Sequence, residues 1–365
     1  MRRVFVTRRI PDEGLRLLEA EDLAVHVGQS REDAGVDRAS LLKEAARSHG
    51  LLSLLTEPVD RELLEASPGL LGVANCAVGY DNVDVEAATE LGVPVSNTPG
   101  VLTDTTADLT WALLLGVARR IPEAHEYTVA GRFRIWGPNL LLGADVSPGG
   151  SGRRKVLGIV GPGRIGAAVA ERAAGFRMEV LAHGRSESRE SRESGGELKK
   201  GERRQEAPGT TSPTGPLMRR TSLDELLERS DFVSLHLPLT EATHHLIGEA
   251  ELRRMKESAY LINTSRGAVV DEEALVKALR EGWIAGAGLD VYENEPALTP
   301  GLAELDNVIV APHIGSASRD TRARMATMAA ENLLHHLRGE RAPNVVNPQV
   351  YETEAWEARR ARSNQ

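Results

Sequence analysis

The sequence has little cysteine, few aromatic residues, no long apolar run and no excess of positive charge. Its one cysteine, Cys76, excludes an intramolecular disulfide and is typical of a reducing compartment. Aromatic residues make up only 4% of the chain, so the core must consist mainly of Leu, Val, Ile and Ala. No stretch is long enough to span a bilayer, and Pro11, Asp12 and Glu13 precede any apolar run of the kind a signal peptide needs. We therefore expect a cytoplasmic protein with no membrane partner.

The formal net charge of −9 argues against binding to the phosphate backbone of a nucleic acid, which needs a concentrated basic face. Basic clusters occur at Arg2–Arg3, Arg153–Lys155 and Lys199–Arg204, but no aromatic residues are interleaved with them. We interpret these clusters as solvated loop charges and expect no nucleic-acid partner. The length of 365 residues, with 41% hydrophobic and 27% charged residues, is typical of an ordinary globular protein of two domains.

The first hundred residues alternate short apolar segments with amphipathic ones, which predicts a parallel sheet covered by helices on both faces. The predicted strands are Val4–Thr7, Leu23–Val27, Leu51–Leu55, Leu71–Asn75 and Val93–Ser96. The predicted helices are Asp12–Ala20, Arg38–Ser48, Asp60–Ala66 and Asp84–Leu91. A longer and almost wholly apolar helix follows over Thr103–Arg120, with Asp104 as a cap at its start and Pro122 as its terminator.

A second alternating series begins at Val156 and predicts a complete doubly wound unit. Its strands are Val156–Val160, Glu179–Ala182, Phe232–Leu237, Tyr260–Asn263, Ile284–Leu289 and Val308–Ala311. Its helices are Ile165–Ala174, Leu223–Glu228, Glu249–Met255, Glu272–Glu281 and Arg319–Arg338. The stretch Glu187–Arg220 has almost no apolar residues, so we expect a mobile surface insertion there. The fold class is therefore α/β, with two doubly wound parallel-sheet domains.

The sequence GPGRIG follows the first strand of the second series directly and opens a helix. Gly161 allows a tight turn, Gly163 lets the backbone approach a pyrophosphate, and Gly166 lets helix and strand pack closely. The free amides at the helix start, where Arg164 and Ile165 lie, favour a bound phosphate. This context predicts a dinucleotide cofactor, and the alternative is a tight strand–helix turn with no ligand.

The next strand bears on which cofactor is used. An NAD-binding protein places a carboxylate about twenty residues past the last glycine, where it binds the ribose 2′-hydroxyl. Here the strand is followed by Arg185 and Ser186, and no acid occurs before Glu187. A cation and a hydroxyl at this place favour the 2′-phosphate of NADP(H), with NAD(H) as the second choice. The alternative for Arg185 is an exposed loop arginine.

Three chemically capable side chains, Arg266, Glu295 and His313, each come shortly after a predicted strand of the second series. The carboxyl ends of parallel strands meet at one edge of a sheet, where ligands bind. An arginine holds a carboxylate in two places and polarises a ketone, and a histidine gives a proton to the developing alkoxide. A carboxylate beside that histidine raises its pKa and orients its ring. The set therefore predicts reduction of a 2-keto acid.

Each assignment has an alternative. Arg266 is open to a role in a structural salt bridge, and Glu293 competes with Glu295 because it lies only two residues away. The adjacent pairs His244–His245 and His335–His336 lack the spacing by which two histidines on one helix bind a metal. We therefore predict no metal site.

Six motifs in combination resemble the D-isomer-specific 2-hydroxyacid dehydrogenases, and within them the glyoxylate/hydroxypyruvate reductases. They are Asn75–Asp84, Asn97–Asp104, Gly161–Gly166, Asn263–Gly267, Gly286–Val291 and Pro312–Ser316. The resemblance covers roughly residues 1–347. It implies a flavodoxin-like substrate domain of residues 1–100 and 318–347 and a Rossmann-type NAD(P)-binding domain of residues 101–317 inserted into it. The inserted domain includes a dimerisation arm, 121–145, and the insertion 187–220, and residues 348–365 form a C-terminal tail.

The resemblance also implies roles for individual residues. The family's catalytic arginine, glutamate and histidine fall on Arg266, Glu295 and His313, and the backbone amides of Val78 and Gly79 bind the substrate carboxylate. The remaining cofactor contacts fall on Leu237, Pro238, Thr243, Thr264, Ser265, Asp290, His313 and Gly315. The family forms homodimers through the arm, from which Trp136 reaches the partner's active site.

These expectations together predict an oxidoreductase that reduces glyoxylate to glycolate or hydroxypyruvate to D-glycerate. The hydride comes from NADPH and the proton from His313. Two alternatives remain open at this point. One is another D-2-hydroxyacid dehydrogenase, acting on D-lactate or phosphoglycerate. The other is a nucleotide-sensing binding protein similar to the corepressors related to this family.

Overall fold

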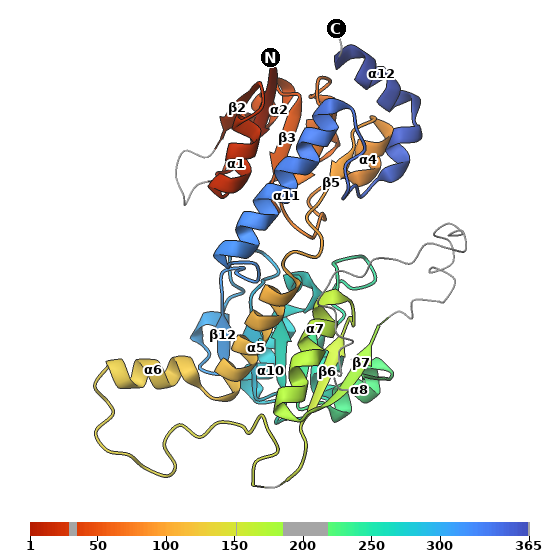
Figure 1. Cartoon of the computed structure of the whole chain (residues 1–365). Helices are drawn as coiled ribbons and strands as arrows, with labels where there is room; N and C mark the ends of the chain where they lie inside the picture. The colour runs from red at the N-terminus through yellow and green to blue at the C-terminus, as the bar shows by residue number, and fades with distance from the viewer. Residues whose placement is uncertain (29–34, 151, 185–217, 364–365) are drawn as a thin grey trace, which may run out of the picture. The chain divides into compact units, whose positions relative to one another are not determined.

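The computed structural model describes residues 1–28, 35–150, 152–184 and 218–363, and the chain divides into two compact units. The first unit comprises Met1–Thr105 and Ser316–Gln365, and the second comprises Thr106–Gly315. The second unit is therefore an insertion in the sequence of the first. Figure 1 labels many of the elements of both units.

The first unit contains a five-stranded parallel sheet with the strand order β2-β1-β3-β4-β5. Its strands are β1 (Arg2–Val6), β2 (Leu23–Val27), β3 (Gly50–Ser53), β4 (Gly72–Asn75) and β5 (Val95–Ser96). This order is that of flavodoxin-like sheets, in which ligands bind beyond the carboxyl ends of the strands. The predicted fold class of this unit is confirmed.

The helices of this unit begin where aspartates can cap them. The side chains of Asp37, Asp60 and Asp84 accept hydrogen bonds from backbone N–H groups in the first turns of α2, α3 and α4. The helices are α1 (Asp12–Glu19), α2 (Arg38–Ala46), α3 (Arg61–Glu65), α4 (Val85–Glu90), α11 (Arg319–Arg338) and α12 (Glu354–Ser363). Helix α1 packs on α11, which covers β3 and β4, so distant parts of the sequence share one core.

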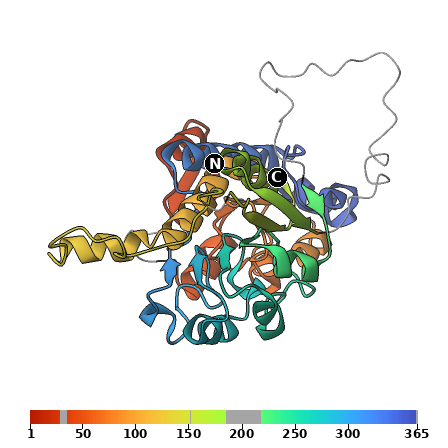
Figure 2. The same ribbon diagram turned by 90° about the horizontal axis from the view of Figure 1, so that it is seen from below.

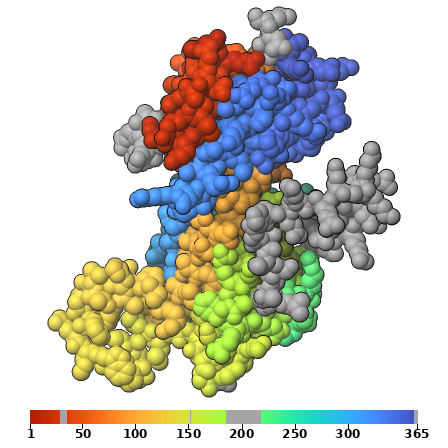
Figure 3. All heavy atoms as spheres, viewed as in Figure 1, coloured from red at the N-terminus to blue at the C-terminus, as the bar shows by residue number. Residues whose placement is uncertain are grey.

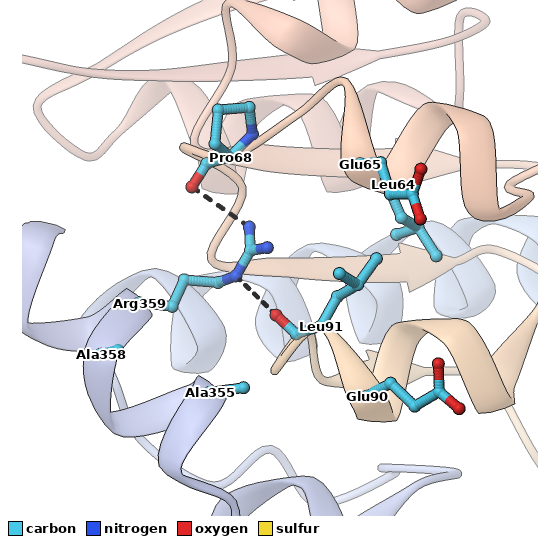
Figure 4. Close-up of a pocket in the computed structure, with 8 residues that line it drawn as sticks. All are labelled: Leu64, Glu65, Pro68, Glu90, Leu91, Ala355, Ala358 and Arg359. Atoms are coloured by element: carbon cyan, nitrogen blue, oxygen red, sulfur yellow. Dashed lines mark hydrogen bonds between the residues drawn. The ribbon is translucent and has the colours of Figure 1, made fainter.

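Residues 348–363 form structure that the sequence analysis assigned to a tail. A short 3₁₀ helix at Pro348–Glu352 leads into α12, whose Trp356 is buried. The guanidinium of Arg359 donates hydrogen bonds to the carbonyl groups of Ser67, Leu70 and Leu91, at 2.8–3.1 Å. Figure 4 shows this side chain in a pocket between α12 and the ends of α3 and α4. Helix α12 is therefore held on the first unit.

The second unit contains a seven-stranded parallel sheet with the order β12-β11-β10-β9-β6-β7-β8. Its strands are β6 (Val156–Val160), β7 (Glu179–His183), β8 (Arg219–Arg220), β9 (Phe232–Leu235), β10 (Tyr260–Asn263), β11 (Gly286–Leu289) and β12 (Val308–Val310). Counted from β6 as the first strand, this is the Rossmann order 3-2-1-4-5-6 with one strand added. The order reverses between β6 and β9, which lie side by side.

Both faces of this sheet are covered. Alternate residues of β6 point to opposite faces, so Leu157 and Ile159 pack with α5 and α7, whereas Val156 and Val160 pack with α8, α9 and α10. The helices are α5 (Thr103–Ala118), α6 (Ile121–Val129), α7 (Arg164–Arg172), α8 (Leu223–Arg229), α9 (Glu249–Arg254) and α10 (Glu272–Glu281). None of the helices in the described ranges combines the length and the apolar composition needed to cross a bilayer.

A buried carboxylate joins β6 to β9. Asp231, just before β9, is only 3% exposed. It accepts hydrogen bonds from Val156 N at 2.9 Å, Arg153 Nη2 at 2.7 Å and Lys256 Nζ at 3.2 Å. Burial raises the pKa of Asp231, but the Val156 N–H and the two cations outweigh burial and hold the pKa below its ordinary value.

Three local predictions were wrong. Asp104 lies within the first turn of α5 and does not precede the helix, although a carboxylate there still favours the helix dipole. Pro122 lies in the first turn of α6, where its missing N–H leaves no hydrogen bond unmade, so it begins a helix that the sequence analysis did not predict. Arg219–Arg220 forms strand β8 at the end of the predicted insertion. Residues 187–217 of that insertion lie outside the described residues.

Candidate active site

The carboxyl ends of β10, β11 and β12 carry the three residues predicted to be catalytic. These strands are neighbours in the sheet, so the turns that follow them meet at one edge. Arg266 follows β10, Glu295 follows β11 and His313 follows β12. All three lie in the second unit.

The structure brings His313 and Glu295 into contact. His313 Nδ1 lies 2.9 Å from Glu295 Oε2, and Glu295 Oε1 accepts a hydrogen bond from Tyr292 N at 3.0 Å. Burial raises the pKa of Glu295, but its hydrogen bonds and the charges of His313 and Arg266 hold the pKa below its ordinary value. Glu295 is therefore an ionised acceptor at neutral pH. It leaves Nε2 as the ring nitrogen that can reach a substrate.

Asp290 holds the turn that carries His313. Its backbone oxygen accepts from His313 N at 2.9 Å. Its two carboxylate oxygens accept from Ile314 N and Gly315 N, each at 2.7 Å. Burial raises the pKa of Asp290, an effect that the two amides and the charge of His313 partly offset. His313 itself has a left-handed backbone, with φ of 52°, a conformation that non-glycine residues adopt mainly where the surroundings impose it.

Arg266 lies on a turn that Asn263 organises. Asn263 Oδ1 accepts from Ser265 N at 3.0 Å, and Asn263 Nδ2 donates to Arg266 O at 2.9 Å. Gly267 then packs against the backbone that leads to Glu295. A Cβ at this glycine would lie 1.8 Å from the carbonyl carbon of Tyr292, so only glycine lets the two turns approach so closely.

The glycine-rich loop lies where the strand order of this sheet reverses. Gly161 has φ of +94°, and a Cβ there would lie 2.5 Å from the carbonyl oxygen of His236. Gly163 precedes α7 without a side-chain cap, and Arg164 and Ile165 begin the helix. The first N–H groups of α7 are therefore suited to bind an anion such as a pyrophosphate.

The loop after β9 runs beside the glycine-rich loop and contains three of the predicted cofactor residues. Thr243 Oγ1 donates to Pro238 O at 2.7 Å and accepts from Thr240 N at 2.8 Å, which closes the turn after Leu237. His236 begins this loop, with Nε2 2.9 Å from Ser234 Oγ. Burial lowers the pKa of His236 to about 3, so its imidazole stays neutral. The sequence left His236 as either a core residue or a neighbour of the cofactor, because nothing in the pattern separates the two.

Four further predicted site residues, Arg185, Ser186, Thr264 and Trp136, differ in what the structure describes of them. Arg185 and Ser186 lie outside the described residues, although β7, which precedes them, is tied to Gly161 N through the carbonyl oxygen of His183 at 2.8 Å. Thr264 is buried, and its hydroxyl lies 2.9 Å from that of Thr110. Trp136 follows α6 and is 74% exposed.

Val78 and Gly79 belong to the first unit. Asn97 Nδ2 donates to Val78 O at 2.7 Å, and Asn75 Nδ2 donates to Gly79 O at 2.9 Å. Within the described ranges, the N–H groups of Val78 and Gly79 donate to no protein acceptor. These two amides are therefore available to a ligand.

Comparisons with known proteins agree on one family. The model of the NAD-binding domain of D-isomer specific 2-hydroxyacid dehydrogenases matches residues 111–315. A glyoxylate reductase of Korarchaeum cryptofilum is 49% identical, over 95% of this chain and 96% of the relative. The crystal structure of the TT0316 protein from Thermus thermophilus is 44% identical with a TM-score of 0.81, over 94% of this chain and 99% of that chain. An NADPH-dependent glyoxylate/hydroxypyruvate reductase of Sinorhizobium meliloti is 30% identical with a TM-score of 0.75, over 95% and 98% of the two chains.

Proposed function

The chain belongs to the D-isomer-specific 2-hydroxyacid dehydrogenase family, and we propose that it reduces glyoxylate to glycolate and hydroxypyruvate to D-glycerate with His313 as proton donor. The observation that carries the proposal is the contact between His313 Nδ1 and the ionised Glu295 at the carboxyl edge of a Rossmann sheet. The names of the similar reductases support the choice of substrates.

The residues of the second unit fit a nicotinamide dinucleotide. Gly161 has the left-handed backbone of a tight turn, and the uncapped start of α7 suits a pyrophosphate. Thr243, Leu237 and Pro238 form the adjoining turn, which we assign to the adenosine side. When bound, the reduced cofactor supplies the hydride for C2 of the keto acid.

The side chains supply the remaining chemistry. Arg266 binds the substrate carboxylate and polarises the C2 carbonyl, because a guanidinium stays charged and offers several donors. His313 gives its Nε2 proton to the oxygen that becomes the hydroxyl, while Glu295 holds the ring from Nδ1. One hydride and one proton together convert the C2 carbonyl, an aldehyde in glyoxylate and a ketone in hydroxypyruvate, to the alcohol.

We assign NADP(H) as the preferred cofactor. The support is the sequence after β7, where Arg185 and Ser186 stand in place of an acid, and the similarity to a reductase named as NADPH-dependent. Thr264, Ser265, Asp290 and Gly315 belong to the proposed nicotinamide side. Of these, Asp290 already accepts two backbone N–H groups, so a carboxamide there would take a further lone pair.

We propose a homodimer formed through α6 and the segment that follows it. Figures 1 and 2 both show α6 projecting from the second unit, and Figure 3 shows the segment after it at the surface. The exposed apolar side chains of this arm are Ile121, Val129, Phe133, Ile135, Trp136 and Leu142. Several large exposed apolar side chains on one projecting segment favour a surface that a second protein covers. The cytoplasmic location stays a prediction that rests on the single cysteine.

Initial rates of NADPH and NADH oxidation test the function. The full chain is assayed with glyoxylate, hydroxypyruvate, pyruvate and 3-phosphohydroxypyruvate. We expect the first two to give the highest kcat/KM. A preference for pyruvate or the phosphorylated acid would favour the lactate or phosphoglycerate alternative. Nucleotide binding without turnover of any of the four would favour the corepressor-like alternative.

A further inference from the structure

Two adjacent histidines and a glutamate meet beside the candidate active site. His244 and His245 lie in the loop after β9, and Glu293 lies in the turn after β11. One ligand atom from each of these three side chains lies within 4.8 Å of the other two. Sequence analysis predicted no metal site, because adjacent histidines lack the spacing by which two histidines on one helix bind a metal. Nothing in the sequence indicated that Glu293, after another strand, would meet them.

The three side chains are accessible and already partly assembled. His245 Nε2 lies 2.7 Å from Glu293 Oε1, and the rings of His244 and His245 stack with centroids 4.0 Å apart. The side chains of His245 and Glu293 are 37% and 22% exposed, and His244 is exposed. An ion can therefore reach all three from solvent.

The backbone fixes the two turns that carry these side chains. His245 has a left-handed backbone, with φ of 50°, and its N–H donates to Ala268 O at 2.8 Å. Glu293 N donates to Glu272 Oε1 at 2.9 Å, and Glu272 N donates to Glu293 Oε2 at 3.4 Å. Hydrogen bonds thus hold both turns on the second unit, so the contact between His245 and Glu293 joins two fixed segments of backbone.

We propose that His244, His245 and Glu293 form a binding site for a divalent transition-metal ion of the Zn²⁺ class. Imidazole nitrogen and carboxylate oxygen are preferred zinc ligands, and three protein ligands leave one tetrahedral position for water. Tetrahedral bonds of about 2.0–2.1 Å bring two ligand atoms to roughly 3.4 Å. The ligand atoms here lie within 4.8 Å of one another. Rotation of the exposed His244 side chain away from its stacked position on His245 would bring both imidazole nitrogens and the carboxylate to that spacing. Two imidazoles disfavour Ca²⁺ and Mg²⁺, which prefer oxygen ligands.

Titration of the chelator-treated full chain with ZnCl₂ by calorimetry tests the site. Loss of a group that only orients a metal ligand costs about 10- to 100-fold in affinity. Loss of a ligand should cost at least as much, so we expect His245→Ala and Glu293→Gln each to weaken Zn²⁺ binding by about tenfold or more. His244→Ala, at an exposed position, gives the same test with little risk to folding.

A matched control is available in the first unit. His335 Nδ1 lies 2.8 Å from Glu340 Oε2, and its neighbour His336 is also a histidine but is fully buried. The His335→Ala variant removes a similarly exposed histidine–carboxylate pair and should leave Zn²⁺ affinity unchanged. Unchanged affinity in His244→Ala, His245→Ala and Glu293→Gln would overturn the proposal.

The nearby pair of His313 and Glu295 is the competing ligand set. The His313→Gln variant should retain one Zn²⁺ per chain, and loss of binding there with retention in His245→Ala would assign the ion to the catalytic pair and overturn the proposal. Absorption of bound Co²⁺ gives an independent readout. We expect the intense visible bands of a tetrahedral ion in the wild type and their loss in Glu293→Gln. Neither measurement depends on turnover, so failure of this site and failure of the proposed function are distinguishable.

Discussion

His313 Nδ1 lies 2.9 Å from Glu295 Oε2, and the same carboxylate receives the backbone N–H of Tyr292 on its other oxygen. The glutamate is therefore held from two sides, and the histidine ring is oriented by a group that is itself oriented. A pair of this kind fixes which ring nitrogen faces the ligand.

Replacement of His313 by glutamine should remove most turnover while the protein still binds NADPH. General acid catalysis contributes about 10²- to 10⁴-fold in rate, so we expect a fall in kcat of that order. Initial rates with glyoxylate and quenching of protein fluorescence by NADPH measure the two properties. The His335→Gln variant, which alters the other exposed histidine–carboxylate pair, is the control. Near-wild-type kcat in His313→Gln would assign the proton to another group.

The Arg185→Asp variant should change the preference between cofactors. Loss of a charge-assisted contact to the 2′-phosphate, worth about 1.5–3 kcal/mol, corresponds to roughly tenfold or more in the ratio of kcat/KM for NADPH to that for NADH. Arg220 is the comparison, because its Nη1 lies 3.4 Å from Gly184 O, next to the end of β7. If Arg220→Asp shifts the ratio of kcat/KM values and Arg185→Asp does not, the residue that binds the 2′-phosphate is Arg220.

The Gly267→Ala variant should lose activity together with stability. The added methyl would overlap the backbone of Tyr292 and Glu293, so the turn that carries Glu295 must move. We expect a loss of about 1–3 kcal/mol in the free energy of unfolding, as in other overpacked sites. Gly175→Ala is the control, since a Cβ at Gly175 has no neighbour within 4 Å. Thermal unfolding and kcat are measured for both variants. Equal losses of stability and of kcat in the two would contradict the close approach of Gly267 to the backbone of Tyr292.

The Asp231→Asn variant should destabilise the second unit in a pH-dependent way. The pKa of Asp231 is lower in the folded chain than in the unfolded one, so its contribution is complete above the unfolded value of about 3.9 and disappears as the pH falls through the folded value. At pH 7 we expect a loss of about 1–3 kcal/mol in the free energy of unfolding. Denaturant unfolding of wild type and variant should show a difference that shrinks below about pH 4.

Asp108→Asn is the matched control for that experiment. Asp108 pairs with Arg172 at 2.8 Å, but its side chain is 67% exposed. Exposed pairs contribute at most about 1 kcal/mol, so this variant should unfold almost as the wild type does. A larger loss of unfolding free energy in Asp108→Asn than in Asp231→Asn would show that burial does not decide how much each carboxylate stabilises the fold.

The Ile135→Asp variant should convert the proposed dimer to a monomer. Ile135 is 81% exposed in the chain, and a carboxylate there would be costly to bury against a second copy. Light scattering with size-exclusion chromatography measures the molar mass. Leu55→Asp, at another exposed apolar position of the chain, should leave the mass unchanged. A monomeric wild type would refute the arm as an interface.

The sheets were predictable because their strands are short apolar runs bounded by polar segments. The strands β2, β6 and β10 have the bounds expected from the sequence, and α10 and α11 do so among the helices. Helix α12 was missed because it is polar over most of its length. Its Arg359 donates to the carbonyl groups of Ser67, Leu70 and Leu91, which lie far away in the sequence.

Strand ends also located the candidate site, since each of Arg266, Glu295 and His313 follows a strand of one parallel sheet. Other features depend on tertiary contacts that no spacing reveals. Glu293 competed with Glu295 in the sequence, and the structure gives the two different partners, His245 and His313. The hydrogen bonds from the backbone after His313 to Asp290 could likewise not be predicted. The sequence does not show from which N–H groups a carboxylate will accept hydrogen bonds.

The hydrogen bonds to Asp290 have a consequence for the proposed reaction. The N–H groups of residues 313–315 are hydrogen-bonded to Asp290, and the imidazole of His313 is hydrogen-bonded to Glu295. The backbone and the ring are therefore both positioned when the chain folds and not when a substrate arrives. In the proposed reaction, the entropy cost of positioning the proton donor is therefore incurred on folding and is not part of the barrier in each cycle.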